Sequence, residues 1–228
     1  MKVSVVVPAF NEENYIKDCL ESILTQTVSP DEIIVVDNNS TDRTVQIAKK
    51  MGARVVKETR QGMIHARNKG FDSAKYEIIA RCDADSRVPV DWIKRIKFNF
   101  ENYDIDALSG PTIFYDYAIK SQLPVKIYTR FMKLLLRGNQ TLIGPNMSLT
   151  KSSWLRVRNF VCLDDQKVHE DIDLSLNIFR IGGKIIHDNE VVVKISARRI
   201  KENPSSFFIE YPARLAKTLW INRAHKTI

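Results

Sequence analysis

The sequence of 228 residues is poor in cysteine and contains no long hydrophobic run. Its three cysteines, Cys19, Cys82 and Cys162, are odd in number and far apart. This usage excludes a disulfide framework and a cysteine-rich zinc site, and it indicates reduced thiols in a cytoplasmic protein. No uncharged apolar run approaches the ~20 residues that cross a bilayer. No basic-then-apolar leader precedes the first predicted strand, so we expect neither a membrane-spanning helix nor a secretory signal.

Acidic residues are fewer than basic residues. The sequence contains 27 Asp and Glu and 35 Lys and Arg, which gives a formal net charge of +8. This excess predicts an anionic partner, and nucleotide phosphates, nucleic acid and an acidic membrane surface all fit it. The basic residues are spread along the chain and form no nucleic-acid-binding motif, so we expect no nucleic-acid partner. A hydrophobic content of 44% is typical of one soluble globular domain.

The first half of the chain alternates predicted strands and helices. Continuous apolar strands are predicted over residues 3–7, 32–36, 53–56 and 76–82, with helices between them. The third helix is predicted over residues 61–75, with a break or bend near Gly70. Strands without alternating polar positions are typical of a parallel sheet that helices cover on both faces.

Glycine is absent from the turn after the first strand, which reads Pro8-Ala9-Phe10-Asn11-Glu12. This absence excludes the glycine fingerprint of dinucleotide-binding proteins and the glycine-rich loop of nucleotidyltransferases. The second and fourth strands end instead at Asp37 and at Asp83-Ala84-Asp85. Parallel strands bring these ends to one edge, where carboxylates and substrate phosphates together suit Mg²⁺ or Mn²⁺. Aspartate is also a common turn residue, so neither motif is specific by itself.

The second half of the chain contains a basic amphipathic segment over residues 117–137, without any acidic residue. It predicts either a helix whose apolar side packs on the core or a helix on an anionic membrane surface. Helices are also predicted over residues 92–100, from His169 to Gly182, and over residues 207–223. Short strands are predicted over residues 107–110, 112–115, 184–186 and 191–193. Arg198 and Arg199 are interpreted as a solvated basic face rather than as groups that close over a phosphate.

Five segments, in order, resemble the family-two glycosyltransferases, an inverting group with the GT-A fold: residues 5–13, 34–42, 66–70, 83–85 and 170–171. The resemblance spans roughly residues 3 to 185. It implies an α/β fold with a mostly parallel central sheet and helices on both faces. It further implies a single domain over residues 1–228. Within that domain, residues 1–88 would form a nucleotide-sugar-binding half, residues 89–193 an acceptor-binding half with the catalytic base, and residues 194–228 a basic tail.

The resemblance also implies roles for individual residues. The residues expected to bind the nucleotide sugar are Pro8, Ala9, Phe10, Glu12, Asp37, Asn39, Arg67, Asp83 and Ala84. Asp85, together with Asp83, would hold the Mg²⁺ or Mn²⁺ ion. Asp171 would be the catalytic base, and Glu170 and Asn146 would contact the acceptor or support the residues that do. The alternative for Glu170-Asp171 is an acidic first helical turn, which the helix dipole favours.

The implied activity is metal-dependent transfer of one sugar, from a donor linked to a nucleoside diphosphate such as UDP, to a glycan or lipid-linked acceptor. The Gln-x-x-Arg-Trp segment of processive members does not follow Glu170-Asp171, which favours single transfer over polymerisation. The basic segments favour peripheral contact with an anionic membrane, at the inner face of the plasma membrane. Two alternatives are a sugar-nucleotide-binding protein without transfer activity and a basic nucleic-acid-binding module. The sequence leaves open whether the working unit is a homodimer.

Overall fold

The computed structural model describes residues 1–117, 121–202 and 210–224. Its elements follow in chain order: β1 (Val3–Ala9), α1 (Ile16–Leu24), β2 (Glu32–Asp37), α2 (Thr44–Lys50), β3 (Arg54–Lys57), α3 (Met63–Ser73), β4 (Ile78–Arg81), α4 (Trp92–Asn102), β5 (Ala107–Ser109), β6 (Thr112–Phe114), α5 (Leu123–Leu135), β7 (Met147–Thr150), α6 (Lys151–Val157), α7 (Glu170–Arg180), β8 (Ile185–His187), β9 (Val193–Ile195), α8 (Arg198–Glu202) and α9 (Tyr211–Ala224). Across these residues, every helix is too short or too polar to cross a bilayer.

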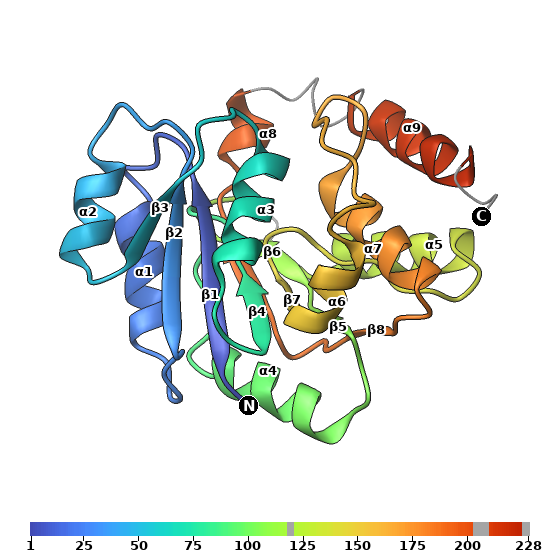
Figure 1. Cartoon of the computed structure of the whole chain (residues 1–228), viewed down its shortest axis with the longest axis horizontal. Helices are drawn as coiled ribbons and strands as arrows, with labels where there is room; N and C mark the ends of the chain where they lie inside the picture. Colours follow the sequence, from blue (N-terminus) through green and yellow to red (C-terminus); the bar gives the residue numbers. More distant parts are fainter. Residues whose placement is uncertain (118–120, 203–209, 225–228) are drawn as a thin grey trace.

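A seven-stranded sheet runs through the centre of the molecule in the order β3-β2-β1-β4-β7-β5-β8 (Figure 1). The strands β1, β2, β3 and β4 pair in parallel, and β7 runs antiparallel to both of its neighbours. The predicted, mostly parallel sheet is therefore confirmed. Because β1 lies between β2 and β4, the carboxyl ends of these three strands are adjacent at one edge. The antiparallel β7 begins at this edge, where Met147 is paired with Arg81.

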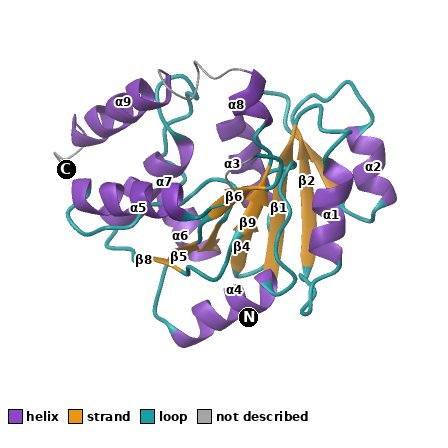
Figure 2. Cartoon of the chain, turned by 180° about the vertical axis from the view of Figure 1, so that it is seen from behind, coloured by secondary structure: helices purple, strands orange, loops and turns teal. Residues whose placement is uncertain are grey.

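The sheet is buried on both faces, as its continuous apolar strands predict. Successive residues of β1 point to opposite faces, so Val5 and Val7 belong to one core and Val6 to the other. The first core lies against α1, α2 and α4, and the second lies against α3, α6 and α7. Figure 1 shows α3, α6 and α7 in front of the sheet, whereas Figure 2 shows α1 on the opposite face.

A second, two-stranded sheet brings the last part of the chain to the same edge. Its strands β6 and β9 are parallel, and an isolated antiparallel bridge joins Lys194 of β9 to Arg87. The amide N–H of Arg87 donates to the carbonyl of Lys194 at 2.7 Å. The Asp116 carboxylate then accepts from the Ala197 amide at 2.6 Å and positions the start of α8. In this way, residues far apart in the sequence meet beside Asp83 and Asp85.

Some predicted boundaries are wrong. The third helix ends at Ser73 and is not broken at Gly70. A Cβ on Gly70 would lie 2.2 Å from Cγ1 of Val6 and 2.9 Å from Cγ2 of Val36. Glycine therefore allows α3 to approach the sheet closely, which is a packing role and not a helix break. The strand predicted over residues 191–193 is shifted to Val193–Ile195. Of the helices predicted over residues 117–137 and 207–223, residues 118–120 and 207–209 lie outside the described residues.

We expect Gly70→Ala to destabilise the protein, because the added methyl group must displace two fully buried valines. Overpacking costs about 1–3 kcal/mol, and the better helix propensity of alanine offsets up to about 1 kcal/mol of this. Urea denaturation measures the change in the free energy of unfolding. The exposed neighbour Lys69 provides the control, since Lys69→Ala should change this free energy by less than about 0.5 kcal/mol. A Gly70→Ala protein as stable as wild type would contradict the packing role.

Candidate active site

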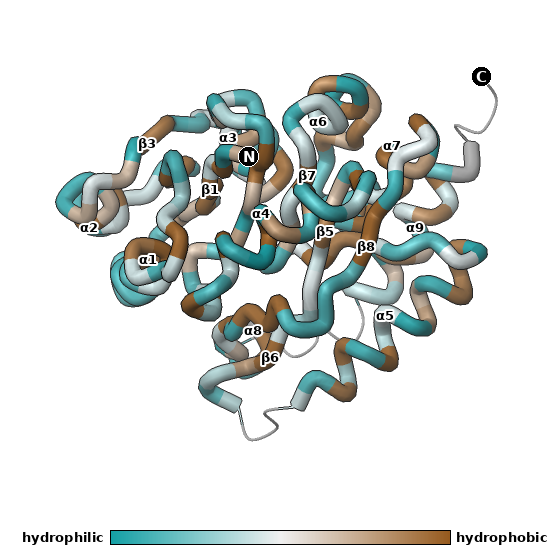
Figure 3. Tube along the Cα trace, turned by 90° about the horizontal axis from the view of Figure 1, so that it is seen from below, coloured by the Kyte–Doolittle hydropathy of each residue, from teal (hydrophilic) through white to brown (hydrophobic). Residues whose placement is uncertain are grey.

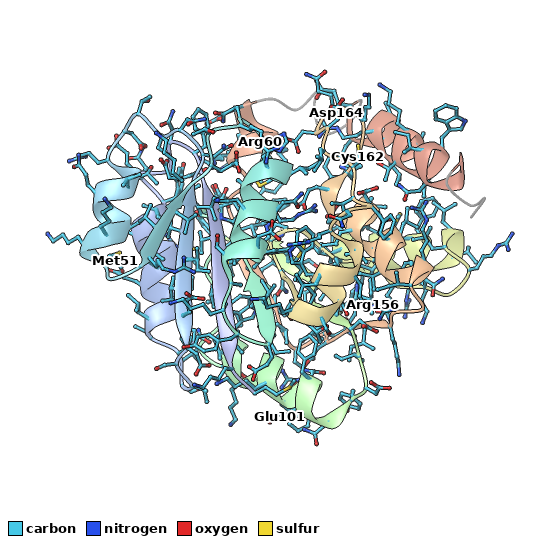
Figure 4. All side chains as sticks on the ribbon, in the orientation of Figure 1. Met51, Arg60, Glu101, Arg156, Cys162 and Asp164 are labelled. Atoms are coloured by element: carbon cyan, nitrogen blue, oxygen red, sulfur yellow. The ribbon has the colours of Figure 1, made fainter. Side chains whose placement is uncertain are left out.

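A cavity of about 320 Å³ opens at the carboxyl edge of the sheet, and we call it the donor cavity. Its lining residues are Pro8, Ala9, Phe10, Glu12, Asn38, Gln61, Gly62, Met63, Ala66, Asp83, Ala84, Asp85, Arg198 and Glu202. Figure 4 labels Arg60 at this end of the molecule and Glu101 at the opposite end. Seven of the residues predicted to bind the nucleotide sugar or its metal line this cavity. They come from the ends of β1 and β4, as the sheet order requires.

Two predicted nucleotide ligands, Asp37 and Asn39, do not line the cavity. Asp37 is buried, and its Oδ1 accepts the amide N–H of Ser40 at 2.9 Å. Asn39 donates from Nδ2 to the carbonyl of Thr59 at 2.9 Å. Both side chains therefore hold the turn after β2. The residue between them, Asn38, reaches the cavity instead, a position to which the sequence assigned no role.

Arg67, which the resemblance predicts to bind the nucleotide, is paired with protein groups in this structure. Arg67 is fully buried and does not line the donor cavity. Its Nη1 donates to the Glu170 carboxylate at 2.5 Å and to the Glu170 carbonyl at 2.6 Å, and its Nε and Nη2 donate to Asn68. Its guanidinium therefore fixes the start of α7, because a buried charge needs a charged or hydrogen-bonding partner.

A second buried arginine, Arg81, links the two acidic motifs. Arg81 is 1% exposed at the end of β4. Its Nη1 donates to Oε1 of Glu170, and its Nη2 donates to Oδ1 of Asp83 at 2.8 Å. Glu170 thus lies between two guanidinium groups. Burial alone would raise the pKa of Glu170, but the positive charges of Arg81 and Arg67 lower it below its usual value.

The neighbouring Asp171 has the opposite electrostatic environment. Burial and the negative charge of Glu170 raise the pKa of Asp171 to about 6, against the opposing effects of the Gly144 amide, of Arg81 and of the Ile172 amide. Oδ2 of Asp171 accepts from the Gly144 amide at 3.1 Å, and Oδ1 accepts from the Ile172 amide at 2.9 Å. The carboxylate is therefore oriented, and its raised pKa is typical of a general base.

Asp171 lies in a second cavity of about 330 Å³, which we call the base cavity. Its lining residues are Met63, Arg81, Asp83, Gly144, Pro145, Asp165, Val168, His169, Glu170, Asp171, Tyr211 and Arg214. Met63 and Asp83 line both cavities, so the two cavities meet at the end of β4. The carboxylate with the raised pKa therefore lies next to the donor cavity.

Helix α9 forms one wall of the base cavity, although the sequence assigned the tail no place in the site. Nε2 of His169 lies 2.8 Å from the Tyr211 carbonyl, and the two rings are tilted by 40° with centroids 3.9 Å apart. The His169 amide donates to Thr218 of the same helix. Asn146, predicted to contact the acceptor or to support the residues that do, is bonded in the core to Trp92, Pro111 and Val191. It supports the loop that presents Gly144 to Asp171.

Arg198 is not the solvated residue that we expected. It lines the donor cavity, donates to Glu12, and has its Nε 3.3 Å from Oδ2 of Asp85. The side chain of Arg199 lies outside the described part of the chain. Other lining residues to which the sequence assigned no role include Gln61, Met63, Arg81, Asp165, Glu202, Tyr211 and Arg214. Only Arg81 carried a usable signal, since a charged residue within a predicted buried strand requires a partner.

The donor cavity is strongly acidic. Among the described residues, Glu12, Asp83, Asp85 and Glu202 place four carboxylates in its lining, and Arg198 places one guanidinium there. The described residues hold no group of three or more His, Cys, Asp or Glu side chains with metal-binding geometry. Two carboxylates nevertheless fit a Mg²⁺ or Mn²⁺ ion whose remaining ligands are water and phosphate oxygens. Asp85 and Asp83 are the residues that would hold it.

Comparison with known proteins gives one family. The family model described as Glycosyl transferase family 2 matches residues 4–161, so Glu170 and Asp171 lie beyond the match. Glycosyltransferase GlyA of Streptococcus pneumoniae is 26% identical over 216 residues, which cover 87% of this chain and 31% of GlyA. Glycosyltransferase GlyG of the same species is 35% identical over 120 residues, covering 50% of this chain and 40% of GlyG. The chain therefore spans well under half the length of these curated relatives.

Two solved structures have a similar fold. TarS of S. aureus has a TM-score of 0.68 at 19% identity, covering 95% of this chain and 65% of that one. TarS has also been crystallised with UDP-GlcNAc. Glucosyl-3-phosphoglycerate synthase of Mycobacterium tuberculosis, in complex with Mn²⁺, UDP and phosphoglyceric acid, has a TM-score of 0.68 at 20% identity. That match covers 95% of this chain and 78% of the synthase. At these identities, the likeness concerns the fold alone.

The two adjacent acids Glu170 and Asp171 should have opposite effects on stability. Because the pKa of Asp171 is raised, ionising this carboxyl group lowers the free energy of unfolding. The whole cost is present above about pH 6, and none of it is present below the unfolded pKa near 4. Asp171→Asn should therefore raise the free energy of unfolding by about 1–3 kcal/mol near pH 8. The gain should disappear near pH 4. Urea denaturation at the two pH values measures it, and a gain that is independent of pH would contradict the raised pKa.

Glu170→Gln is the matched comparison, because it removes the charge that Arg67 and Arg81 share. The lowered pKa of Glu170 contributes stability above its unfolded pKa, and this contribution is lost as the pH falls through the lower folded value. Breaking such a buried pair costs about 3–5 kcal/mol near neutral pH. The cost should diminish toward acid pH in the same urea series. A Gln variant as stable as wild type near pH 7 would mean that the ion network does not hold α7 in place.

Proposed function

This chain belongs to glycosyl transferase family 2 and has the predicted GT-A fold, and we propose that it transfers a single sugar from a nucleoside diphosphate sugar to an acceptor hydroxyl, with inversion. One observation carries this proposal. The acidic donor cavity and the cavity of the carboxylate with the raised pKa meet at Asp83. A donor in the first cavity and an acceptor in the second would thus face each other across the end of β4.

Asp171 is the general base in this proposal. The acceptor hydroxyl loses its proton to the Asp171 carboxylate while its oxygen bonds to the anomeric carbon, and the bond from that carbon to the diphosphate oxygen breaks. A pKa of about 6 makes Asp171 a stronger base than an ordinary aspartate, yet leaves it ionised near pH 7. Glu170 suits this role poorly, because both of its oxygens accept from arginines and its pKa is lowered.

The positions of the two adjoining cavities favour inversion. The base lies on the side of α7 and α9, so an acceptor would approach from there, whereas the donor cavity lies at the ends of β1 and β4. Attack from the side opposite the leaving diphosphate inverts the anomeric carbon in one step. Asp83, whose carboxylate is held by Arg81, stands between the two reactants.

We include Mg²⁺ or Mn²⁺ in the proposal because of the charge of the donor cavity. A diphosphate would meet four carboxylates and one guanidinium there, and like charges repel unless a cation joins them. A divalent ion held by Asp85 and Asp83 would supply that cation and would offset the charge that develops on the leaving diphosphate. The Mycobacterium tuberculosis synthase, which shares the fold, was crystallised with both Mn²⁺ and UDP.

The donor that we favour is UDP-linked, since TarS was crystallised with UDP-GlcNAc and the synthase with UDP-glucose. The acceptor would be a glycan or a lipid-linked molecule in the base cavity. Residues 1–88 would form most of the donor half and residues 89–193 the acceptor half. The tail completes both, since Arg198 and Glu202 line one cavity and Tyr211 and Arg214 line the other.

Donor binding can be tested without knowing the acceptor. UDP, GDP, dTDP and ADP are added with and without Mn²⁺ in a thermal-shift assay. Saturation at about a hundred times the dissociation constant should stabilise the protein by roughly 2.7 kcal/mol. We expect UDP to stabilise wild type only with Mn²⁺, and Asp85→Asn to abolish the effect. The exposed Asp104 provides the control, because Asp104→Asn should respond like wild type. If UDP with Mn²⁺ stabilised Asp85→Asn as much as wild type, Asp85 would not be part of the donor site.

The base is tested by turnover, measured as release of UDP from the donor sugar that the shift assay selects. Asp171→Asn should lower kcat by about 10²–10⁴-fold while leaving the UDP-dependent thermal shift intact. Wild-type kcat/KM should rise with pH through about pH 6, as Asp171 ionises. If Asp171→Asn keeps wild-type turnover, another group is the base. Donor binding without turnover in wild type would favour a protein that binds sugar nucleotides without transferring the sugar.

A further inference from the structure

Helix α5 presents an apolar stripe to solvent. Its exposed side chains are Leu134 at 82%, Leu123 at 61%, Ile127 at 60%, Phe131 at 54% and Leu135 at 41%. At about 100° per residue, these positions share one third of the helix circumference. The helix packs on the protein through a different third, which includes the buried Met132. Of the two alternatives predicted for this segment, the one in which its apolar side packs on the core is therefore contradicted for this stripe.

The remaining third of α5 is basic. Lys126, Arg130, Lys133 and, just past the end of the helix, Arg137 project next to the apolar stripe, and all four are exposed. No acidic residue occurs anywhere between Asp116 and Asp164. Figure 3 shows hydrophobic and hydrophilic residues alternating along α5 at the edge of the molecule. We call the apolar stripe and its basic flank the α5 surface.

A groove of about 610 Å³ continues from the C-terminal end of the α5 surface, between α5, α7 and α9. Apolar side chains form much of its lining, namely Leu135, Leu136, Leu176, Phe179 and Leu219. Arg137 and Arg180 also line it, and no acidic side chain does so among the described residues. An apolar groove bordered by arginines has the chemistry to hold an acyl chain with an anionic headgroup.

We propose that the α5 surface and this groove dock on an anionic lipid bilayer. Apolar side chains would enter the boundary between headgroups and acyl chains, and the basic flank would pair with phosphates, as in interfacial amphipathic helices. Charge favours a bilayer over a second copy of the chain. A two-fold dimer through this surface would place its four basic residues against their own copies.

The proposed docking does not require transfer activity, but its use in bringing a lipid-linked acceptor to Asp171 rests on the proposed function. The groove contacts α7 at Leu176, Phe179 and Arg180, whereas Asp171 lies in the first turn of the same helix. Arg180 follows Asp171 by nine positions, a rise of about 14 Å along the helix. A lipid-linked acceptor held in the bilayer would thus need to extend only a short distance to reach the base.

Flotation with vesicles tests the docking. Vesicles of phosphatidylcholine alone are compared with vesicles that also contain phosphatidylglycerol, at low and at high salt. We expect wild type to float with the anionic vesicles at low salt and to stay in solution with the neutral ones. The double variant Phe131→Ser/Leu134→Ser should weaken binding at least about tenfold. Lys126→Gln/Arg130→Gln should weaken it about fivefold for each residue, the equivalent of about 1 kcal/mol.

Matched variants keep the test specific. Phe98 on α4 is 53% exposed, nearly as much as Phe131 at 54%, and Phe98→Ser should bind like wild type. Lys49→Gln/Lys50→Gln on α2 removes the same charge as the basic double variant and should also bind like wild type. Thermal unfolding checks that each variant is folded. Equal losses in the Phe131/Leu134 and Phe98 variants, or no flotation of wild type, would overturn the proposal.

Two further measurements distinguish a bilayer from a second copy of the chain, and docking from sugar transfer. A wild-type dimer that Phe131→Ser/Leu134→Ser converts to a monomer, measured by analytical ultracentrifugation, would assign the α5 surface to a second copy and overturn the proposal. Failure of flotation alongside a UDP-dependent thermal shift would reject the docking and leave the donor site intact. Flotation without any thermal shift would support the docking and reject the proposed function.

Discussion

The interaction on which the site depends is the pairing of the partly buried Glu170 carboxylate with the guanidinium groups of Arg67 and Arg81. Charges removed from water are tolerated only when they are paired and hydrogen-bonded. The geometry of this pairing therefore fixes three elements at once, because Arg67 comes from α3, Arg81 from β4 and Glu170 from the start of α7. Arg81 extends the network to Asp83 and so joins the donor cavity to the base cavity.

The same network separates the roles of two adjacent acids. The charge of Glu170 is neutralised by the two arginines, which lower its pKa. Burial and the negative charge of Glu170 raise the pKa of Asp171. Two adjacent residues thus provide a structural ion pair and a carboxylate suited to general base chemistry. Local hydrogen bonds complete the separation, since the Gly144 amide orients Asp171 from the loop that leads into β7.

The positive charge of the chain is not concentrated where a phosphate would bind. The formal net charge is +8, yet the described residues place four carboxylates and one guanidinium in the lining of the donor cavity. Arg198 reaches two of these carboxylates, Glu12 and Asp85, from the short helix α8. A segment without acidic residues, from residue 117 to 163, contributes instead to the α5 surface and to the adjoining groove. The fold thus places an acidic site and a basic, apolar surface on different parts of one domain.

The sequence by itself determined the alternating strands and helices, the parallel sheet and the acidic ends of β2 and β4, because these follow from local periodicity and from residues within short segments. Seven of the residues that the family resemblance assigned to the donor or its metal line the donor cavity. Only the tertiary structure decided that Arg67 pairs with Glu170, 103 positions away, and that Arg198 and α9 complete the cavities. It also decided which side of α5 is covered. Helical periodicity shows that a face is apolar, whereas contacts between distant segments decide whether that face is buried or left in solvent.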